Sequence, residues 1–141
     1  MKIFLSTIQE EESEDFEKYF ITKPSKHMTD FWRFRYSENT IKILKDVRKN
    51  DWFLFAYNGK YMYAAQVKER RKLVVSFKNL IEISRGFVKT NNEFGISSSM
   101  PSVHRIPLLE VNDSKIQQII KKYHSIEGFL HERKIQIKKP H

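Results

Sequence analysis

The sequence predicts an α+β domain, and three local patterns support that class. The segment "DWFLFAYNGKYMYAAQVKE" joins two aromatic, β-rich runs through Asn58-Gly59, a dipeptide that favours type I′ hairpin turns because both residues tolerate positive φ. Residues 37–51 and 112–124 space their apolar side chains as amphipathic helices do. At 141 residues the chain is long enough for one domain with its own core and short for two.

The N-terminal part begins with a strand and a helix. Residues 2–8, "KIFLSTI", combine β-branched and aromatic side chains without a breaker, as strands do. Ser13 then precedes "EDFEKYF", which we expect to be helical because its acidic residues lie near the N-terminus, where the helix dipole favours negative charge. After Pro24 a polar loop leads to the aromatic and basic cluster "DFWRFRY".

The middle of the chain contains a helix and most of the predicted strands. Ser37 is in position to cap a helix that places Ile41, Leu44 and Val47 on one face. The hairpin follows, and "ERRK" is expected to form a basic turn after it. "LVVSF" and "NLIEISRGFV" are then two further strand-like segments.

The last third has a long polar segment and a second clear helix. Residues 89–102 show no periodicity, and loops of that length inside a compact domain are often functional. "HRIPLLEV" is strand-like, and a helix capped by Asn112, Asp113 or Ser114 follows it. The apolar face of this helix consists of Ile116, Ile119, Ile120 and Tyr123. The ending "SIEGFLHERKIQIKKPH" is basic and has no clear pattern.

The charge is strongly asymmetric along the chain. The formal net charge is +9, yet residues 21–141 hold 24 basic and 11 acidic residues, a net charge of +13. This balance favours a polyanionic partner, with nucleic acid ahead of a membrane surface because no basic amphipathic helix has a strong apolar face. No segment has the roughly 20 apolar residues of a membrane span, and the acidic start differs from a secretory signal. We therefore expect a cytoplasmic protein.

Residues for metal or enzyme chemistry are sparse. The chain has no cysteine, and its five histidines show no ligand spacing, so we expect no structural metal and no cofactor. No Gly-rich phosphate loop or hydrolase motif is present, and the chain is expected to be non-catalytic. Two alternatives stay open: an interaction domain without nucleic acid, and a metal-dependent nuclease. The nuclease would have to use Asp46, Asp51, Glu69 and Lys68.

Aromatic residues make up 13% of the chain and are interleaved with arginine in "WRFRY". Proteins hold an unstacked base on an aromatic face, with arginine at the neighbouring phosphates. Two of the three hairpin residues Trp52, Phe53 and Phe55 are expected to be core. Trp32 is the stronger candidate for a ligand pocket because it precedes a helix and lies outside a clear period.

The order of these elements resembles the PUA-like superfamily, and within it the EVE and YTH domains. The resemblance covers roughly residues 2–123 and is carried by "KIFLST", the acidic helix, "FW" before the second helix, the hairpin, "FKNLIEISRGFV" and "VHRIPLLEVNDSKIQQII". It implies a twisted, β-barrel-like sheet with flanking helices and a pocket for a flipped, modified base. In YTH domains a tryptophan before the second helix forms one wall of a cage around a methylated adenine, and Trp32 is the match.

The chain departs from YTH domains after the hairpin, where "KERRKLVV" replaces a long insertion that carries the second cage tryptophan. The resemblance then requires a second wall from elsewhere and a polar group for the base edge. Candidates for the second wall are Phe94, Tyr57 and Phe55. Candidates for reading the base edge are Ser6, Thr7, Asn91 and Asn92. Candidates for phosphate binding are Arg33, Arg35, Arg70, Arg71, Lys72 and Arg85.

The same superfamily supplies the N-terminal DNA-reading domains of archaeal McrB-type restriction proteins, which this chain resembles in size and in its basic ending. The resemblance implies a DNA-binding specificity module of a modification-dependent, McrBC-type restriction system that flips a modified base into an aromatic pocket. Residues 1–125 would form the EVE/YTH-like domain, and residues 126–141 a basic extension leading to a motor domain in a larger AAA+ oligomer. The alternative within the same fold is a PUA/EVE-type RNA-binding protein that reads a modified ribonucleotide.

Overall fold

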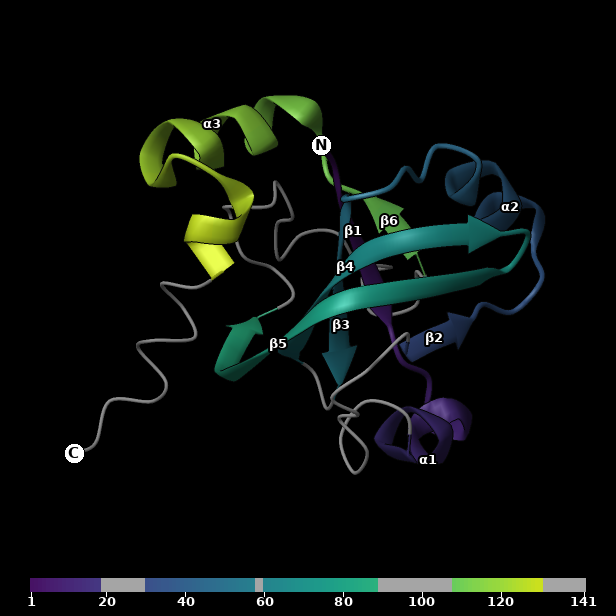
Figure 1. Ribbon diagram of the computed structural model, residues 1–141. Helices are drawn as coiled ribbons and strands as arrows, with labels where there is room; N and C mark the ends of the chain where they lie inside the picture. The colour runs from purple at the N-terminus through teal and green to yellow at the C-terminus, as the bar shows by residue number, and fades with distance from the viewer. Residues whose placement is uncertain (19–29, 58–59, 89–107, 131–141) are drawn as a thin grey trace.

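The computed structural model describes residues 1–18, 30–57, 60–88 and 108–130 and has an α+β fold (Figure 1). Six strands form one sheet that curls into a half-barrel, with helices packed on both of its faces. The strands are β1 (Ile3–Thr7), β2 (Asp30–Arg33), β3 (Trp52–Tyr57), β4 (Lys60–Arg71), β5 (Val74–Val88) and β6 (Leu108–Glu110). The helices are the 3-10 helix η1 (Glu10–Glu12), α1 (Ser13–Phe16), α2 (Glu38–Leu44) and α3 (Asp113–Tyr123).

The sheet has the strand order β2-β5-β4-β3-β1-β6. β1 and β3 run parallel, with Leu5 opposite Leu54, and every other pair in this order is antiparallel. Parallel strands need a crossover connection, and here residues 8–51, which include α1, β2 and α2, make it. The α+β class that the sequence predicts is therefore confirmed, and the PUA-like assignment stays a proposal.

The long hairpins follow the turn chemistry of the sequence. Asn58-Gly59 lies outside the described residues, and the antiparallel pairing of β3 with β4 on either side of it, up to Tyr57 and Lys60, confirms the predicted hairpin. In the next hairpin Arg71 pairs with Val74, and Lys72 in the turn has a φ of 54°. The two strand segments expected after this turn are one strand, β5. Asn79 (φ 55°) is an extra, bulged residue between the partners of Ala65 and Gln66, and the pairing with β4 continues on both sides of it.

Alternation of side chains along the parallel strands β1 and β3 divides the interior into two cores. Ile3, Leu5 and Leu54 point to one face, where α3 covers them. Phe4 and Phe53 point to the other face, into an aromatic layer near α1 and α2. Because side chains alternate with a period of two, each strand of the parallel pair contributes to both cores.

The caps of both predicted amphipathic helices are confirmed, but α2 ends at Leu44, so Val47, which the sequence analysis placed on its face, is buried beyond the end of the helix. The Ser37 side chain accepts a hydrogen bond from the Thr40 backbone N–H at the start of α2. At the start of α3 the Asn112 side chain accepts one from the Ser114 N–H. The four residues expected on the apolar face of α3 all pack on the core, two buried and two partly buried: Ile116, Ile119, Ile120 and Tyr123. None of the helices in the described ranges is long and apolar enough to cross a membrane.

The packed unit extends past residue 125, where the sequence analysis placed the domain boundary. Residues 126–130 are helical, and Ile126, Phe129 and Leu130 are buried in the core under α3. The Phe129 ring lies against Tyr123, with their centroids 4.9 Å apart. The boundary expected at 125 is therefore wrong for these five positions, since they help to close one of the two cores. Residues 131–141 lie outside the described residues.

Asp51 joins the N-terminus of the chain to the start of β3. Its carboxylate is buried and accepts hydrogen bonds from the backbone N–H of Lys2 at 2.9 Å and of Arg48 at 2.8 Å. Both carboxylate oxygens are therefore engaged in holding two chain segments together. This placement gives Asp51 a structural role in place of the metal-binding role that the nuclease alternative assigned to it.

We expect Asp51→Ala to lower the free energy of unfolding by about 2 to 3 kcal/mol, because it leaves two partly buried N–H donors without an acceptor. Urea denaturation of the variant measures this loss. Asp46→Ala is the matched control, since Asp46 is exposed and should change stability little. Equal stability of the two variants would contradict the joining role of Asp51.

Phe129→Ala should destabilise the fold by about 3 to 5 kcal/mol, the usual cost of removing a fully buried phenylalanine. Thermal unfolding followed by circular dichroism measures the effect, with the exposed Glu127→Ala as the control on the same helical segment. A Phe129 variant as stable as the control would restore the domain boundary at residue 125.

Candidate functional site

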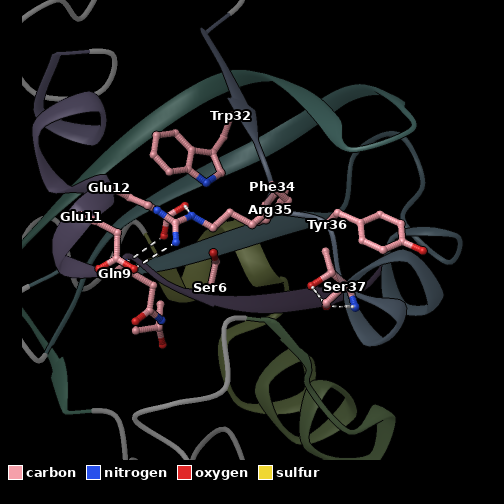
Figure 2. A pocket seen from close by; sticks show the side chains of 11 residues that line it. Ser6, Gln9, Glu11, Glu12, Trp32, Phe34, Arg35, Tyr36 and Ser37 are labelled. Atoms are coloured by element: carbon pink, nitrogen blue, oxygen red, sulfur yellow. Dashed lines mark hydrogen bonds and ion pairs between the residues drawn. The ribbon is translucent and has the colours of Figure 1, made fainter.

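A cavity of about 350 Å³ opens where β1 ends and the chain turns into η1. It lies between the end of β1, the segment that follows β2 and the first turn of α2 (Figure 2). The lining residues are Ser6, Thr7, Gln9, Glu11, Glu12, Trp32, Phe34, Arg35, Tyr36, Ser37 and Thr40.

The cavity exists because the aromatic layer stops at Ser6. Phe4 and Ser6 point to the same face of β1, and Ser6 pairs with Phe55 on β3. A serine in this row leaves space that another ring would fill. Ser6 is 2% exposed, and its hydroxyl points into the cavity (Figure 2). No hydrogen bond joins that hydroxyl to another group in the part of the chain that the structure describes.

Trp32 forms the wall opposite Ser6 (Figure 2). It stands on β2, a strand that the sequence analysis did not predict, where it pairs with Val75 of β5. The ring is 5% exposed and meets Phe16 edge to face, with their centroids 5.6 Å apart at 82°. Trp32 is thus partly a core residue, and only the part of its ring that borders the cavity can meet a ligand.

The rim of the cavity carries an ion-pair network centred on Arg35. Its Nη1 lies 3.0 Å from Glu11 Oε1, and its Nε lies 3.8 Å from Glu12 Oε2. Glu12 Oε1 also accepts a hydrogen bond from the Gln9 backbone N–H at 3.0 Å, which fixes its position. The Tyr36 ring is exposed at the other side of the mouth and extends away from Trp32 (Figure 2).

Hydrogen bonding lowers the pKa of the Glu11 carboxyl from its ordinary value of 4.5. The main cause is a hydrogen bond from the backbone N–H of Glu11 itself, which lowers the pKa. The charge and the hydrogen bond of Arg35 lower it further, whereas partial loss of hydration raises it. The rim therefore combines the ionised Glu11 with a second acidic side chain, Glu12, around Arg35. It is rich in hydrogen-bond acceptors and a poor place for a phosphate.

The α2 side of the cavity is polar but already engaged. The Ser37 hydroxyl accepts from the Thr40 backbone N–H at 3.0 Å and lies 2.9 Å from the Thr40 hydroxyl. These bonds cap the helix, so Ser37 shapes the cavity wall while it stabilises α2. Among the buried hydroxyls that line the cavity in the described part of the chain, those of Ser6 and Thr7 thus remain to meet a ligand.

The structure brings together three of the residues expected to bind a base: Ser6, Thr7 and Trp32 line one cavity. Phe55 does not belong to it, because it is fully buried between Phe16 and Phe77 and has no face left for a ligand. The other expected positions lie outside what the structure describes: Phe94, Asn91, Asn92 and the side chain of Tyr57.

The residues expected to bind phosphate are in different situations. Arg33, Arg71 and Lys72 are exposed near the turn between β4 and β5. Arg70 is half-buried, and its Nη1 donates to the Lys72 carbonyl at 3.3 Å. Arg35 belongs to the pocket rim, where it is paired with Glu11 and Glu12. The side chain of Arg85 lies outside the described residues.

Comparisons with known proteins assign no role to the pocket, so its chemistry is argued from its geometry. A scan against protein-family models and a search of curated proteins each found no match. Within the described ranges no three acidic or histidine side chains are grouped so that they could hold a metal ion. The chemistry that the cavity offers is therefore that of a ring wall, a buried hydroxyl and a charged rim.

We expect the Glu11 carboxyl to titrate below 4.5 in the wild-type protein and closer to 4.5 in Arg35→Gln, because part of the pKa depression comes from Arg35. Since the folded-state pKa is lowered, ionised Glu11 stabilises the fold above its unfolded pKa. That contribution is lost as pH falls through the lowered value. Carboxyl-detected NMR titration measures both midpoints, with Arg33→Gln as the control. A midpoint at or above 4.5 in the wild type would contradict the arrangement.

Proposed function

We propose that this chain is a non-catalytic nucleic-acid-binding module that accepts an extruded base in the Trp32 cavity. One observation carries the proposal: Trp32 and the buried Ser6 hydroxyl face the same cavity of about 350 Å³. The volume lies near the lower end of the roughly 300 to 1,000 Å³ typical of small-molecule sites. A ligand the size of one base fits this space, with a ring against Trp32 and an edge toward Ser6.

The charge pattern supports a base in the cavity and phosphates outside it. Glu11 and Glu12 at the rim can accept hydrogen bonds from ring or amino N–H groups, and they repel phosphate. Arg33 and Arg71, at the ends of β2 and β4, and Lys72, in the turn after β4, are exposed and can neutralise the phosphate backbone. Affinity would then come mainly from salt-sensitive phosphate contacts, and selectivity from the cavity.

The energetics favour modest discrimination between modified and plain bases. Extruding a base costs a few kcal/mol, and stacking on an aromatic side chain returns about 1 to 3 kcal/mol. A buried methyl group adds about 0.8 kcal/mol. A modified base is therefore preferred strongly only if a hydrogen bond to its edge, such as one from Ser6, also changes.

At the level of biology, we propose the DNA-binding specificity module of a modification-dependent restriction system of the McrBC type, with a PUA-like fold of the EVE and YTH kind. The curled sheet with helices on both faces and the Trp32 pocket support this reading. RNA as the partner is an outcome of the test below, since the same pocket could take a ribonucleotide.

The test is binding to one duplex prepared unmodified, with methylated adenine and with methylated cytosine. We expect the wild type to prefer one modified duplex, and Ser6→Leu, which fills the cavity, to lose that preference while keeping salt-sensitive binding. Trp32→Phe keeps a smaller stacking face and should weaken binding of the preferred duplex by less than about tenfold, because the loss of a whole stack costs about 1 to 3 kcal/mol. Trp32→Ala is less informative because it also removes a ring that packs on Phe16.

Asn39→Ala serves as the control variant, because Asn39 is exposed on α2 and does not line the cavity. Fluorescence polarisation at two salt concentrations separates the contribution of the pocket to binding from the salt-sensitive contribution of the basic surface. Equal binding of all three duplexes, unchanged in Ser6→Leu, would reject DNA base reading. Modified RNA that binds instead, and is lost in Ser6→Leu, would assign the pocket to RNA.

A further inference from the structure

A polar cluster lies beside Trp52, where β3 begins, and it is built around the buried Gln66. The Gln66 side chain donates from Nε2 to the Asn50 backbone carbonyl at 3.2 Å and accepts at Oε1 from Asn79 Nδ2 at 2.8 Å. Lys78, the partner of Gln66 on β5, donates from its ammonium to the side-chain carbonyl of Asn50. We call Asn50, Gln66, Lys78 and Asn79 the Gln66 cluster.

The backbone is irregular around this cluster. Asn50 has a φ of 76° and Asn79 a φ of 55°, so two of the four non-glycine residues with positive φ in the described chain belong to it. Lys68 lies beside the cluster as the extra residue of a second bulge, between Val67 and Glu69 on β4. Bulges redirect side chains and are common next to binding sites. The irregular backbone therefore marks this end of the sheet as a region to examine for a ligand.

The turn before β3 is held against β4 by two backbone hydrogen bonds. The Asn50 N–H donates to the Val67 carbonyl at 2.9 Å, and the Val67 N–H donates to the Asp51 carbonyl at 2.7 Å. Lys49 precedes Asn50 and Lys68 follows Val67, so these bonds bring two exposed lysines onto adjacent segments. Because Lys78 is bound to Asn50, three lysine side chains start from one small region of the surface.

The charges of the three lysines are not balanced by an acid in the ranges that the structure describes. No ion pair there joins Lys49, Lys68 or Lys78 to a carboxylate. Lys78 is only half-exposed, and one of its three N–H donors meets the neutral Asn50 side chain. Taking a charge partly out of water is costly unless another charge or further hydrogen bonds compensate it. An anion beside Lys78 would supply both.

We propose that Lys49, Lys68 and Lys78 bind one phosphate monoester group beside the Gln66 cluster. Such a group carries about −1.5 to −2 charge at neutral pH and three acceptor oxygens. It therefore suits three ammonium groups better than a carboxylate or a phosphodiester does, since each of these has a single charge. A small phosphorylated molecule and the terminal phosphate of a polynucleotide share this chemistry. The site uses none of the residues assigned to the base cavity and its phosphate contacts, and it does not depend on that function.

The experiment is an amide NMR titration of the full chain with sodium phosphate at constant ionic strength and neutral pH. We expect saturating shifts of the Asn50, Lys68 and Lys78 signals. Lys78→Met should weaken phosphate binding by about tenfold or more, the scale of one hydrogen bond from a charged group. Lys68→Met, at an exposed position, should weaken it by about two- to fivefold. Lys68→Met also keeps the test decisive if Lys78→Met folds poorly.

Two controls separate this site from general charge and from the cavity. Lys42→Met removes one exposed cation on α2, and Ser6→Leu fills the cavity; neither should change phosphate binding by more than about twofold. The proposal is overturned if phosphate gives no saturating shifts, or if Lys78→Met, Lys68→Met and Lys42→Met all bind it alike.

Two further probes distinguish the sources of the phosphate group. Thymidine 5′-monophosphate represents a small ligand, and oligothymidylate with a 5′-phosphate represents a polynucleotide end. The source that binds more tightly, with Lys78-dependent shifts, is assigned to the site. The same oligothymidylate without its 5′-phosphate should give no such shifts. Equal Lys78-dependent binding with and without the terminal phosphate would reject a monoester site.

Discussion

The parallel pairing of β1 with β3 is the constraint on which the rest of the fold depends. A parallel pair is stable when both of its faces are covered, and here every residue of β1 is buried. One face is covered by α3 and the helical segment after it, the other by an aromatic layer. The long connection between the two strands places α1, β2 and α2 around that layer. Asp51, at the end of this connection, accepts a hydrogen bond from the Lys2 backbone N–H.

The aromatic layer in turn produces the cavity. Phe4 and Phe53 stack with their centroids 5.2 Å apart, and Phe55 continues the row on β3. A serine side chain is much smaller than a ring, so the row leaves a gap where β1 supplies Ser6. The Arg35 network then sets the polarity of the opening. The cavity thus forms where β1 changes from apolar core residues to the polar Ser6 and Thr7.

Local signals in the sequence predicted local structure well. The Asn58-Gly59 hairpin, the Ser37 cap and the face of α3 were all readable, because neighbouring residues decide them. β2 and the bulge at Asn79 were missed, since both depend on partners far along the chain. Of the site, Ser6, Thr7 and Trp32 were predicted. Glu11 and Glu12 were not, because only the fold brings their acidic segment to Arg35.

One strand serves both faces of the sheet. β2 turns Trp32 inward and Phe31 and Arg33 outward, and in the described sheet it is held by a single neighbour, β5. The strand is four residues long and forms one wall of the cavity through Trp32. The position of that wall therefore depends on the pairing of β2 with β5, and a substitution on either face of β2 acts on the same short ladder.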